Sequence, residues 1–217
     1  MTVEEIIREI NEELTDQGFP AHRMLDLMNR GAKLVARGRF QSIPGEICLE
    51  ALETVEDISA DGSTAYIDLT GLSNTFQKKL VSVYNTTSDG WVKIYHSLTE
   101  LKDAYVGLDD SGNIQGVARA GTKLYYQGLS ADTLRLTFFK EPTTLAKGST
   151  PSFLPDEFQV PILKNYVLMH MPKKYTKTLM YDPRADFNEA IYQLYESVGD
   201  YEGSIQLPND LVTWEFY

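Results

Sequence analysis

A run of oxygen-bearing side chains between residues 57 and 68 has the spacing of a cation-binding loop. Asp57, Ser59 and Asp61 alternate with other residues, Gly62 follows, and Asp68 comes eleven residues after Asp57. Oxygen ligands at positions 1, 3, 5 and 12 with glycine at position 6 imitate a calcium loop, because glycine permits the sharp turn. The flanks have strand patterns, whereas helices bracket such a loop. We therefore favour a hairpin turn at Asp61-Gly62, and whether Asp57, Asp61 and Asp68 bind a cation stays open.

Residues for nucleophilic or histidine-based chemistry are few. The chain has one cysteine, Cys48, and three histidines, His22, His96 and His170. No histidine has a second histidine or a cysteine at the spacing of metal ligands. No Gly-x-Ser-x-Gly motif occurs, and Cys48 fits a small buried apolar residue. We therefore assign no catalytic, cofactor-binding or metal-ligating residue and expect that the protein is not an enzyme.

The segment Gly116-Val-Ala-Arg-Ala-Gly-Thr-Lys123 superficially resembles a phosphate-binding loop. That motif has lysine before serine or threonine and lies between a strand and a helix. Here the order is reversed and strand patterns flank both sides. The segment instead predicts a hairpin that turns at Ala120-Gly121.

Charge argues against binding of nucleic acid by bulk electrostatics. The 217 residues include 31 acidic and 20 basic ones, for a net charge of −11. Such an excess repels phosphate backbones unless cations gather on one face. Two clusters could form such a face, or could be solvated helix surfaces: Arg30, Lys33, Arg37 and Arg39, and Lys164, Lys173, Lys174 and Lys177.

Residues 204–217 form an arm that is rich in apolar side chains. Disordered tails are poor in such residues, so we expect this arm to dock. It could pack on its own chain, or it could bind a neighbouring subunit or another partner, where aromatic side chains contribute most of the affinity. The candidate contact residues are Ile205, Leu207, Leu211, Val212, Trp214, Phe216 and Tyr217.

Helical periodicity flanks a central region with the period of strands. Apolar stripes predict helices over residues 2–16 and 21–37. Pro155 can occupy the first position of a third helix, which Pro161 should kink or restart. Asp182 and Pro183 suit the N-cap and first position of a fourth helix.

The central region alternates apolar and polar residues in short runs. Residues 45–51 and 65–69 should form a hairpin around Asp61-Gly62. A short helix interrupts the strands, because Ser97 and Glu100 form a capping box. The other strand candidates are 80–85, 91–95, 114–120, 123–126 and 134–140.

These elements predict an α+β fold. The N- and C-terminal helices, in residues 1–42 and 152–203, should form a four-helix bundle, with an antiparallel β-domain, residues 43–142, inserted in it and an extended C-terminal arm, residues 204–217. The start of the chain lacks a secretory signal, and no apolar run is long enough to span a membrane. We therefore expect synthesis in the cytoplasm.

Several blocks occur together in one order. They read MLDLMNRGAKLVARGRF, STAYIDL, KLVSVYNTTSDGWVKIYHSLTEL, KLYYQGLSADTLRLTFFKEPTTL and PSFLPDEFQVPILKNYVL. In this order the chain resembles the head-to-tail adaptor, or connector, proteins of tailed bacteriophages, from Thr2 to about Val198. One departure is Met171-Pro172, which breaks a helix that family members usually continue.

The resemblance implies a structural virion protein that catalyses no reaction. Copies would form a dodecameric ring that docks beneath the portal at the capsid vertex and offers its other face to a tail or nozzle protein. The ring would close part of the channel through which DNA passes without specific binding. The blocks that would carry over are the helix around Leu25 to Arg39, the strand and turn Val81 to Ile94, and the C-terminal region toward the portal.

Two other function classes stay open. A phage-encoded glycoside hydrolase acting on the cell wall would need a cleft with two acids about 5 to 10 Å apart. A carbohydrate-binding β-module would need an exposed aromatic platform, for which Trp91, Tyr125 and Tyr126 are the candidates. Such a module leaves the flanking helices unexplained.

Overall fold

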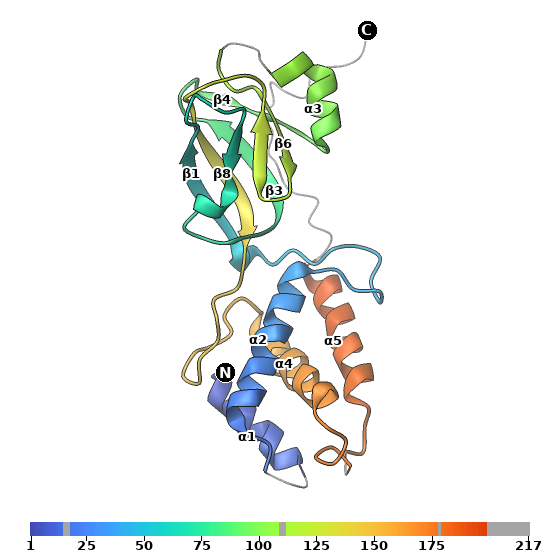
Figure 1. Ribbon diagram of the computed structural model, residues 1–217. Coiled ribbons are helices and arrows are strands. Elements are labelled where there is room, and N and C mark those ends of the chain that lie inside the picture. The colour runs from blue at the N-terminus through green and yellow to red at the C-terminus, as the bar shows by residue number, and fades with distance from the viewer. Residues whose placement is uncertain (15–17, 109–111, 178, 199–217) are drawn as a thin grey trace. The chain divides into compact units, whose positions relative to one another are not determined.

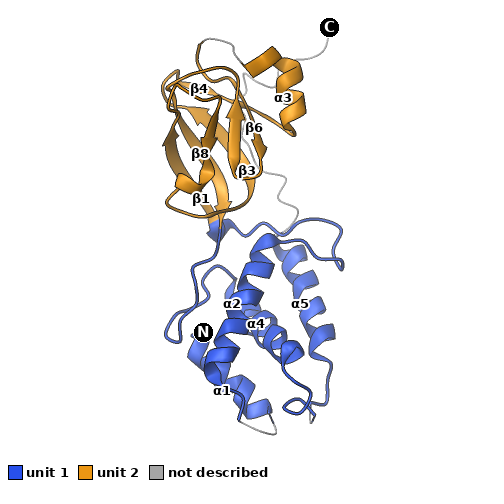
Figure 2. Cartoon of the chain, in the orientation of Figure 1, with its two compact units in different colours: residues 1–52, 141–202 blue, residues 53–140, 203–217 orange. Residues whose placement is uncertain are grey.

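The computed structural model describes residues 1–14, 18–108, 112–177 and 179–198. The fold is α+β, as predicted, and its described residues form two compact units (Figure 2). The helical unit contains residues of 1–52 and 141–198, and the β unit contains residues of 53–140. The sequence-based division gave residues 43–52 and 141–142 to the β-domain, whereas their contacts place them in the helical unit.

Four helices make up most of the helical unit: α1 (Val3–Glu13), α2 (Ala21–Arg37), α4 (Asp156–His170) and α5 (Pro183–Val198). Helix α4 packs against each of the other three (Figure 1). Its residues Ile162, Leu163 and Val167 are fully buried, and it continues through Pro161 in one helix rather than restarting. Within the described residues, no helix combines the length and apolar character that a membrane crossing requires.

Side chains cap the starts of α1 and α5, and the start of α4 differs from the prediction. Thr2 and Glu5 form a complete capping box at α1. Asp182 accepts a hydrogen bond from the backbone N–H of Arg184 at 3.0 Å, which is the expected N-cap contact of α5. Pro155 is the N-cap of α4 rather than its first helical residue.

A glycine in the interior of α2 sets the distance between α2 and α4. A Cβ atom at Gly31 would lie 2.8 Å from Cδ1 and 2.9 Å from Cγ of Tyr166. Any larger side chain would therefore overlap the root of a ring that is 8% exposed. The absence of a side chain at Gly31 lets the two helices approach.

The β unit contains two four-stranded sheets. One has the order β1-β8-β3-β4 and the other β2-β7-β6-β5. Helix α3 (Leu98–Ala104) lies between β5 and β6 in the chain, and Ser97 caps it as predicted. The strands are β1 (Glu53–Ser59), β2 (Tyr66–Asp68), β3 (Phe76–Asn85), β4 (Gly90–Trp91), β5 (Lys93–Tyr95), β6 (Gly116–Ala120), β7 (Lys123–Tyr126) and β8 (Thr133–Lys140).

Two predictions about strand pairing are wrong. No hairpin forms around Asp61-Gly62, because β1 pairs with β8 and β2 pairs with β7 in the other sheet. The alternation over residues 45–51 comes from a buried loop and a 3-10 turn: Ile47, Leu49 and Leu52 point into the core. The β-domain is also not wholly antiparallel, since β5 and β6 pair in parallel across the connection that contains α3.

The predicted hairpin at Ala120-Gly121 is confirmed. Ala120 faces Lys123 in the register of β6 and β7, and Gly121 between them has a φ of 63°. The positive φ favours glycine at this position. The phosphate-loop interpretation therefore finds no strand-to-helix junction here.

The two sheets share one apolar core. Val83, Leu134 and Phe138 from the first sheet pack in one cluster with Val117 and Leu124 from the second. A polar network closes one part of this core. Asp132, 4% exposed, accepts hydrogen bonds through Oδ2 from the Asn85 side chain at 2.6 Å and from the Ile114 backbone N–H at 2.7 Å.

Candidate interaction surfaces

The structure does not bring the residues of the predicted cation loop together. Asp57 forms a two-pronged ion pair with Arg135, with N to O distances of 2.8 and 3.0 Å. Asp61 accepts hydrogen bonds from the backbone N–H groups of Ser63 and Thr64, which lower its pKa to about 2. Each carboxylate therefore has its own local partner.

Asp68 and Ser59 complete this picture. Asp68 caps a 3-10 turn through the backbone N–H of Thr70 at 2.9 Å, and this bond lowers the pKa of Asp68. The Ser59 hydroxyl bonds that of Thr133 across two strands at 2.9 Å. Within the described residues, no three side chains of the metal-ligating types lie close enough together to hold an ion.

The histidines and the cysteine lie apart on separate elements. His22 begins α2, His96 follows β5, and His170 ends α4 with its Nδ1 2.8 Å from the Tyr166 carbonyl oxygen. Cys48 is buried, as predicted, but in the loop before β1 rather than in a strand.

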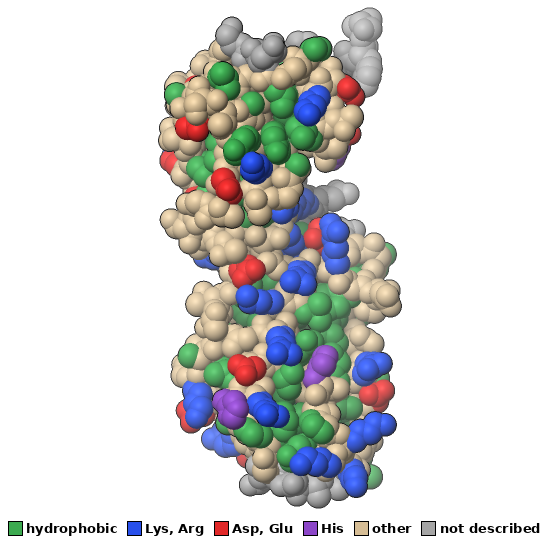
Figure 3. Space-filling model, viewed as in Figure 1, with side chains coloured by type: hydrophobic (Ala, Val, Ile, Leu, Met, Phe, Trp, Pro, Cys, Tyr) green, Lys and Arg blue, Asp and Glu red, His purple; other side chains and the backbone are tan. Residues whose placement is uncertain are grey.

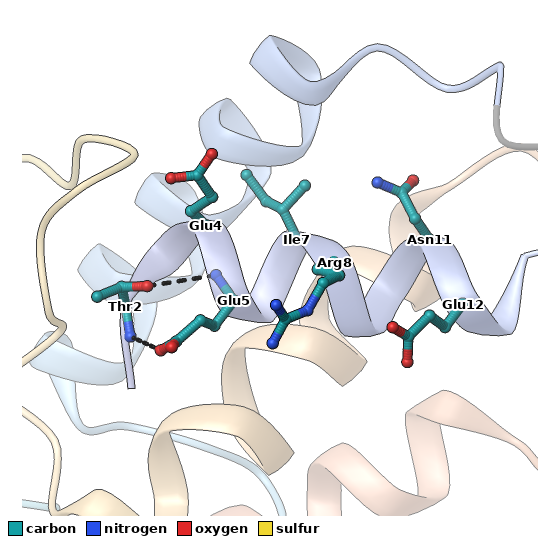
Figure 4. A pocket seen from close by; sticks show the side chains of 7 residues that line it. All are labelled: Thr2, Glu4, Glu5, Ile7, Arg8, Asn11 and Glu12. Carbon is teal, nitrogen blue, oxygen red and sulfur yellow. Dashed lines mark hydrogen bonds between the residues drawn. The ribbon is translucent and has the colours of Figure 1, made fainter.

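A hollow of about 620 Å³ lies along α1, and three of its seven lining residues are acidic: Glu4, Glu5 and Glu12 (Figure 4). Glu4, Ile7 and Asn11 point to one side of the helix and Arg8 and Glu12 to the other. Near the helix start, the Thr2 backbone N–H donates to the Glu5 carboxylate at 2.8 Å. Hydrogen bonds from Thr2 lower the pKa of Glu5. A carboxyl group with a lowered pKa is a poor general acid.

The first basic cluster lies along the exposed side of α2 and just beyond its end. Arg30, Lys33 and Arg37 follow one another at helical spacing. Lys33 pairs with Glu141 at 3.0 Å, and Arg39 pairs with Glu46 at 3.5 Å. Figure 3 shows Lys and Arg side chains gathered on the visible face of the helical unit, with fewer Asp and Glu among them. Neighbouring carboxylates thus engage part of this cluster.

The second basic cluster divides into two environments. Lys164 is 19% exposed and pairs with Glu13 at 2.8 Å, so it ties α4 to α1. The Tyr181 hydroxyl donates to the other oxygen of Glu13. Burial, together with this hydrogen bond, raises the pKa of Tyr181. Lys173, Lys174 and Lys177 are exposed in the α4–α5 connection. Lys164 therefore serves the packing of the unit.

The three residues of the predicted aromatic platform do not share a surface. Tyr126 is fully buried, and its hydroxyl donates to the Thr64 carbonyl at 2.6 Å. Trp91, 45% exposed, lies on β4 of one sheet, whereas Tyr125 lies on β7 of the other. These three residues therefore do not form the platform that a carbohydrate-binding module would need, because the alternation of β7 turns Tyr126 into the core.

The structure reveals a surface that the sequence analysis missed, a groove of about 300 Å³ in the β unit. We call it the Arg119 groove. Arg119 lies with its guanidinium carbon 4.3 Å from the centre of the Phe76 ring, and its Nε donates to the Gly121 carbonyl at 3.0 Å. Partial burial lowers the pKa of Arg119. The lining residues are Leu69, Thr70, Leu72, Thr75, Phe76, Arg119, Gly121 and Thr122.

No sequence pattern marks this groove, because its residues come from β3, β6, the turn after β6 and the loop after β2. These segments come together only when the chain folds. The arm residues Ile205, Leu207, Leu211, Val212, Trp214, Phe216 and Tyr217 lie outside the described residues.

Comparison with known proteins gives the family. A search among curated proteins gave no match. A family model described as "SU10 adaptor protein" matches residues 1–208, nearly the whole chain. The resemblance seen in the sequence blocks is thereby confirmed. The chain belongs to the SU10 adaptor protein family, a family of phage adaptor proteins.

Proposed function

We propose that the protein is a structural virion component that connects the phage head to the tail. Copies form a closed, dodecameric ring in the neck, dock beneath the portal, bridge it to a tail or nozzle protein and line part of the DNA channel. The observation that carries the proposal is the family match over residues 1–208. As a member of an adaptor family, the chain interacts with other head or tail proteins.

The two compact units suit a bridging role. In this proposal the helical unit is a four-helix bundle that receives the β unit as an insertion, and each unit presents its own surfaces to a different neighbour. A closed ring uses heterologous contacts, in which one surface of a subunit meets a different surface of the next. The exposed cations of α2, Arg30 and Arg37, with Lys33 and Arg39 nearby, are candidates for one such contact.

The arm, residues 204–217, supplies a second contact in this proposal. Its aromatic side chains are of the type that anchors protein interfaces. We expect the arm to bind the portal or a neighbouring subunit, and deletion of residues 205–217 should weaken docking more than it lowers the melting temperature. Equal loss of both would indicate that these residues belong to the core of the subunit.

An adaptor without enzymatic activity suits the carboxyl groups better than a glycoside hydrolase does. A hydrolase of this type needs a general acid with a raised pKa. The pKa values of Glu5, Asp57, Asp61 and Asp68 are all lowered, because hydrogen bonds stabilise the charged forms. Measurement of peptidoglycan turnover tests this directly, and hydrolysis by the purified chain would contradict the proposal.

Native mass spectrometry of the chain, alone and mixed with a portal ring from the same phage, tests the adaptor function. We expect a complex that holds one adaptor chain per portal subunit. A tail-tube or coat protein ring of similar size serves as the control for nonspecific association. A chain of 24.5 kDa that stays monomeric beside an intact portal ring would overturn the proposal.

A further inference from the structure

We propose that the Arg119 groove binds the acidic, aromatic segment 205–217 of a second copy of the chain. The proposal rests on the proposed function, since a ring brings the groove of one copy next to the arm of another. It adds the contact that joins neighbouring copies, and it names the residues on both sides.

Arg119 is a cation with unused hydrogen-bonding capacity. Its Nε donates to the Gly121 carbonyl, and the terminal nitrogens have no hydrogen-bond partner among the described residues. No described Asp or Glu lies within ion-pair distance of it. The Asp68 carboxylate accepts hydrogen bonds from Thr70 and is attracted by Lys123. A planar guanidinium in this state can bind a carboxylate through two parallel hydrogen bonds.

The rest of the groove is suited to apolar side chains. Leu69 is 4% exposed and forms part of the floor, together with the half-buried Leu72 and Phe76. Phe76 is held in place because its ring stacks on Phe138 with 5.2 Å between centres. An apolar floor beside an unpaired cation selects a ligand with both large apolar side chains and carboxylates. Figure 3 shows hydrophobic side chains on the visible face of the β unit.

The sequence itself contains a segment of this composition. Residues 199–217 include four acids and neither lysine nor arginine. Within them, Glu215 lies between Trp214 and Phe216. A segment with this charge is attracted to Arg119, and aromatic side chains bury the largest apolar area per residue. The four acids are Asp200, Glu202, Asp210 and Glu215.

A second copy is the occupant that suits a ring. Each subunit then carries one donor, its arm, and one acceptor, its Arg119 groove. Repetition of such a heterologous contact from one copy to the next closes a ring when the rotation is right. The contact joins neighbours through the arm, so the bodies of the subunits keep their own interfaces.

The groove is tested first with a fluorescein-labelled peptide of residues 205–217. The receptor is the full chain with Asp210→Asn and Glu215→Gln, so that the acidic side chains of its own arm do not compete and no opposite charge replaces them. Adding Arg119→Glu or Thr122→Glu to this chain should weaken binding of the peptide by about tenfold or more, as expected for loss of a charge-assisted pair. Lys102→Glu, on the exposed side of α3 and outside the groove, is the matched control and should leave the affinity within about twofold.

The role of the second copy is tested by mixing two full-length variants. The first carries Arg119→Glu, with an intact arm and a reversed groove. The second carries Asp210→Lys and Glu215→Lys, with an intact groove and a reversed arm. Each alone should self-associate at least about tenfold more weakly than the unmodified chain, and the mixture should restore association, because opposite charges meet again in every mixed contact. Sedimentation velocity at several concentrations measures this.

The outcomes separate the parts of the proposal. Peptide binding that is equal in all variants, or absent in all, would overturn the groove as the acceptor. Binding that depends on Arg119 without restoration by mixing would show that the arm folds back on its own chain, which overturns the second copy. A portal complex that forms normally with both variants would leave the adaptor function standing while this contact fails. Peptide binding to a chain that does not join the portal ring would leave the contact between arm and groove standing while the adaptor function fails.

Discussion

The helical unit and the β unit place the polar side chains that bind their loops at different depths, half-buried for Asn29 and buried for Asp132. In the helical unit, the amide of Asn29 accepts from the Leu145 backbone N–H at 2.7 Å and donates to its carbonyl at 3.2 Å. In the β unit, the Asp132 carboxylate and the Asn85 amide meet inside the core. The difference follows from the backbone: helices satisfy their own N–H and C=O groups, and Asn29 serves a loop that joins the helical unit. Loops enclosed between sheets need a side chain within the core.

We expect stability to be more sensitive to loss of the Asp132 side chain in the β unit than to loss of the Asn29 side chain in the helical unit. Asp132→Ala removes the acceptor for the Asn85 side chain and for the Ile114 backbone N–H, and both donors are buried. Leaving buried donors unpaired should lower the free energy of unfolding of the β unit by about 3 kcal/mol. Urea unfolding followed by Trp91 fluorescence, in a chain with Trp214→Phe, measures it.

Asp132→Asn is the matched control for this effect. Its amide oxygen can accept both hydrogen bonds without the charge, so we expect it to retain most of the stability. The helical counterpart, Asn29→Ala, should lower the free energy of unfolding by about 1 kcal/mol, because the Leu145 backbone groups that it leaves unpaired lie at the edge of the unit. An Asn29 effect equal to that of Asp132 would contradict the difference between the units.

The second prediction compares two glycines that face tyrosine rings. A Cβ at Gly31 would overlap Cγ and Cδ1 near the root of the Tyr166 ring, whereas one at Gly116 would meet the Cε2 atoms of Tyr95 and Tyr105. The distal ring atoms of the half-buried Tyr95 and Tyr105 can move away from a new side chain. The Cγ and Cδ1 atoms of Tyr166 lie close to the backbone and cannot. Gly31→Val should therefore destabilise by about 2 kcal/mol, from overpacking.

Gly116→Val gives the contrast. A β-branched residue suits a strand, and the strain against Tyr95 and Tyr105 is relieved by small ring movements, so its cost should be smaller than that of Gly31→Val. Thermal unfolding by far-ultraviolet circular dichroism and by Trp91 fluorescence separates the two units. A larger loss at Gly116 would show that the strands of the β unit are the more rigid packing environment.

The two units also differ in how much of their structure could be predicted from the sequence. Helices α1, α2 and α5 were recognised closely, since a helix is defined by contacts between residues three and four apart. Most strands were found, but the partners of β1 and β2 were not, because strand pairing is set by distant residues and by which face is buried. The local turn at Asp61 looked like a hairpin, and its hydrogen bonds to Ser63 and Thr64 are those of a turn without strand pairing.

The candidate surfaces follow the same rule. Basic residues at helical spacing on α2 could be located from the sequence alone. The Arg119 groove could not, because Phe76 and Arg119 are 43 positions apart in the numbering and meet only through the fold. Tyr126 was misassigned because the pattern KLYY does not reveal which of two adjacent tyrosines faces the core.

The third prediction concerns the stability of the two units at low pH. The pKa values of Asp57, Asp61 and Asp68 in the β unit are lowered, to about 2 for Asp61, and in the helical unit the pKa of Glu5 is lowered. A lowered pKa contributes stability that is present above the unfolded value, about 4, and is lost as the pH falls through the folded value.

The β unit should therefore lose more stability than the helical unit between about pH 4 and about pH 2. Trp91 fluorescence and helical circular dichroism, followed during acid titration of the Trp214→Phe chain, measure the two units. Asp61→Asn should reduce the pH dependence of the β unit, since asparagine does not titrate. Coincident acid transitions that Asp61→Asn leaves unchanged would contradict this assignment.

The smallest predicted effects compare one ion pair from each unit. Lys164 and Glu13 are partly shielded from solvent, at 19% and 31% exposure, and Tyr181 binds the same carboxylate. Lys164→Met should lower the free energy of unfolding by about 1 kcal/mol, because the methylene packing persists while the pair is lost.

Arg135 and Asp57 are 52% and 47% exposed, so water and salt screen their attraction. Arg135→Gln should shift the melting temperature less than Lys164→Met, and added salt should remove its effect first. A larger shift for Arg135→Gln would mean that cross-strand pairing at the surface holds β1 to β8 more strongly than its exposure implies, and the β unit would then depend on charge at its edge as well as in its core.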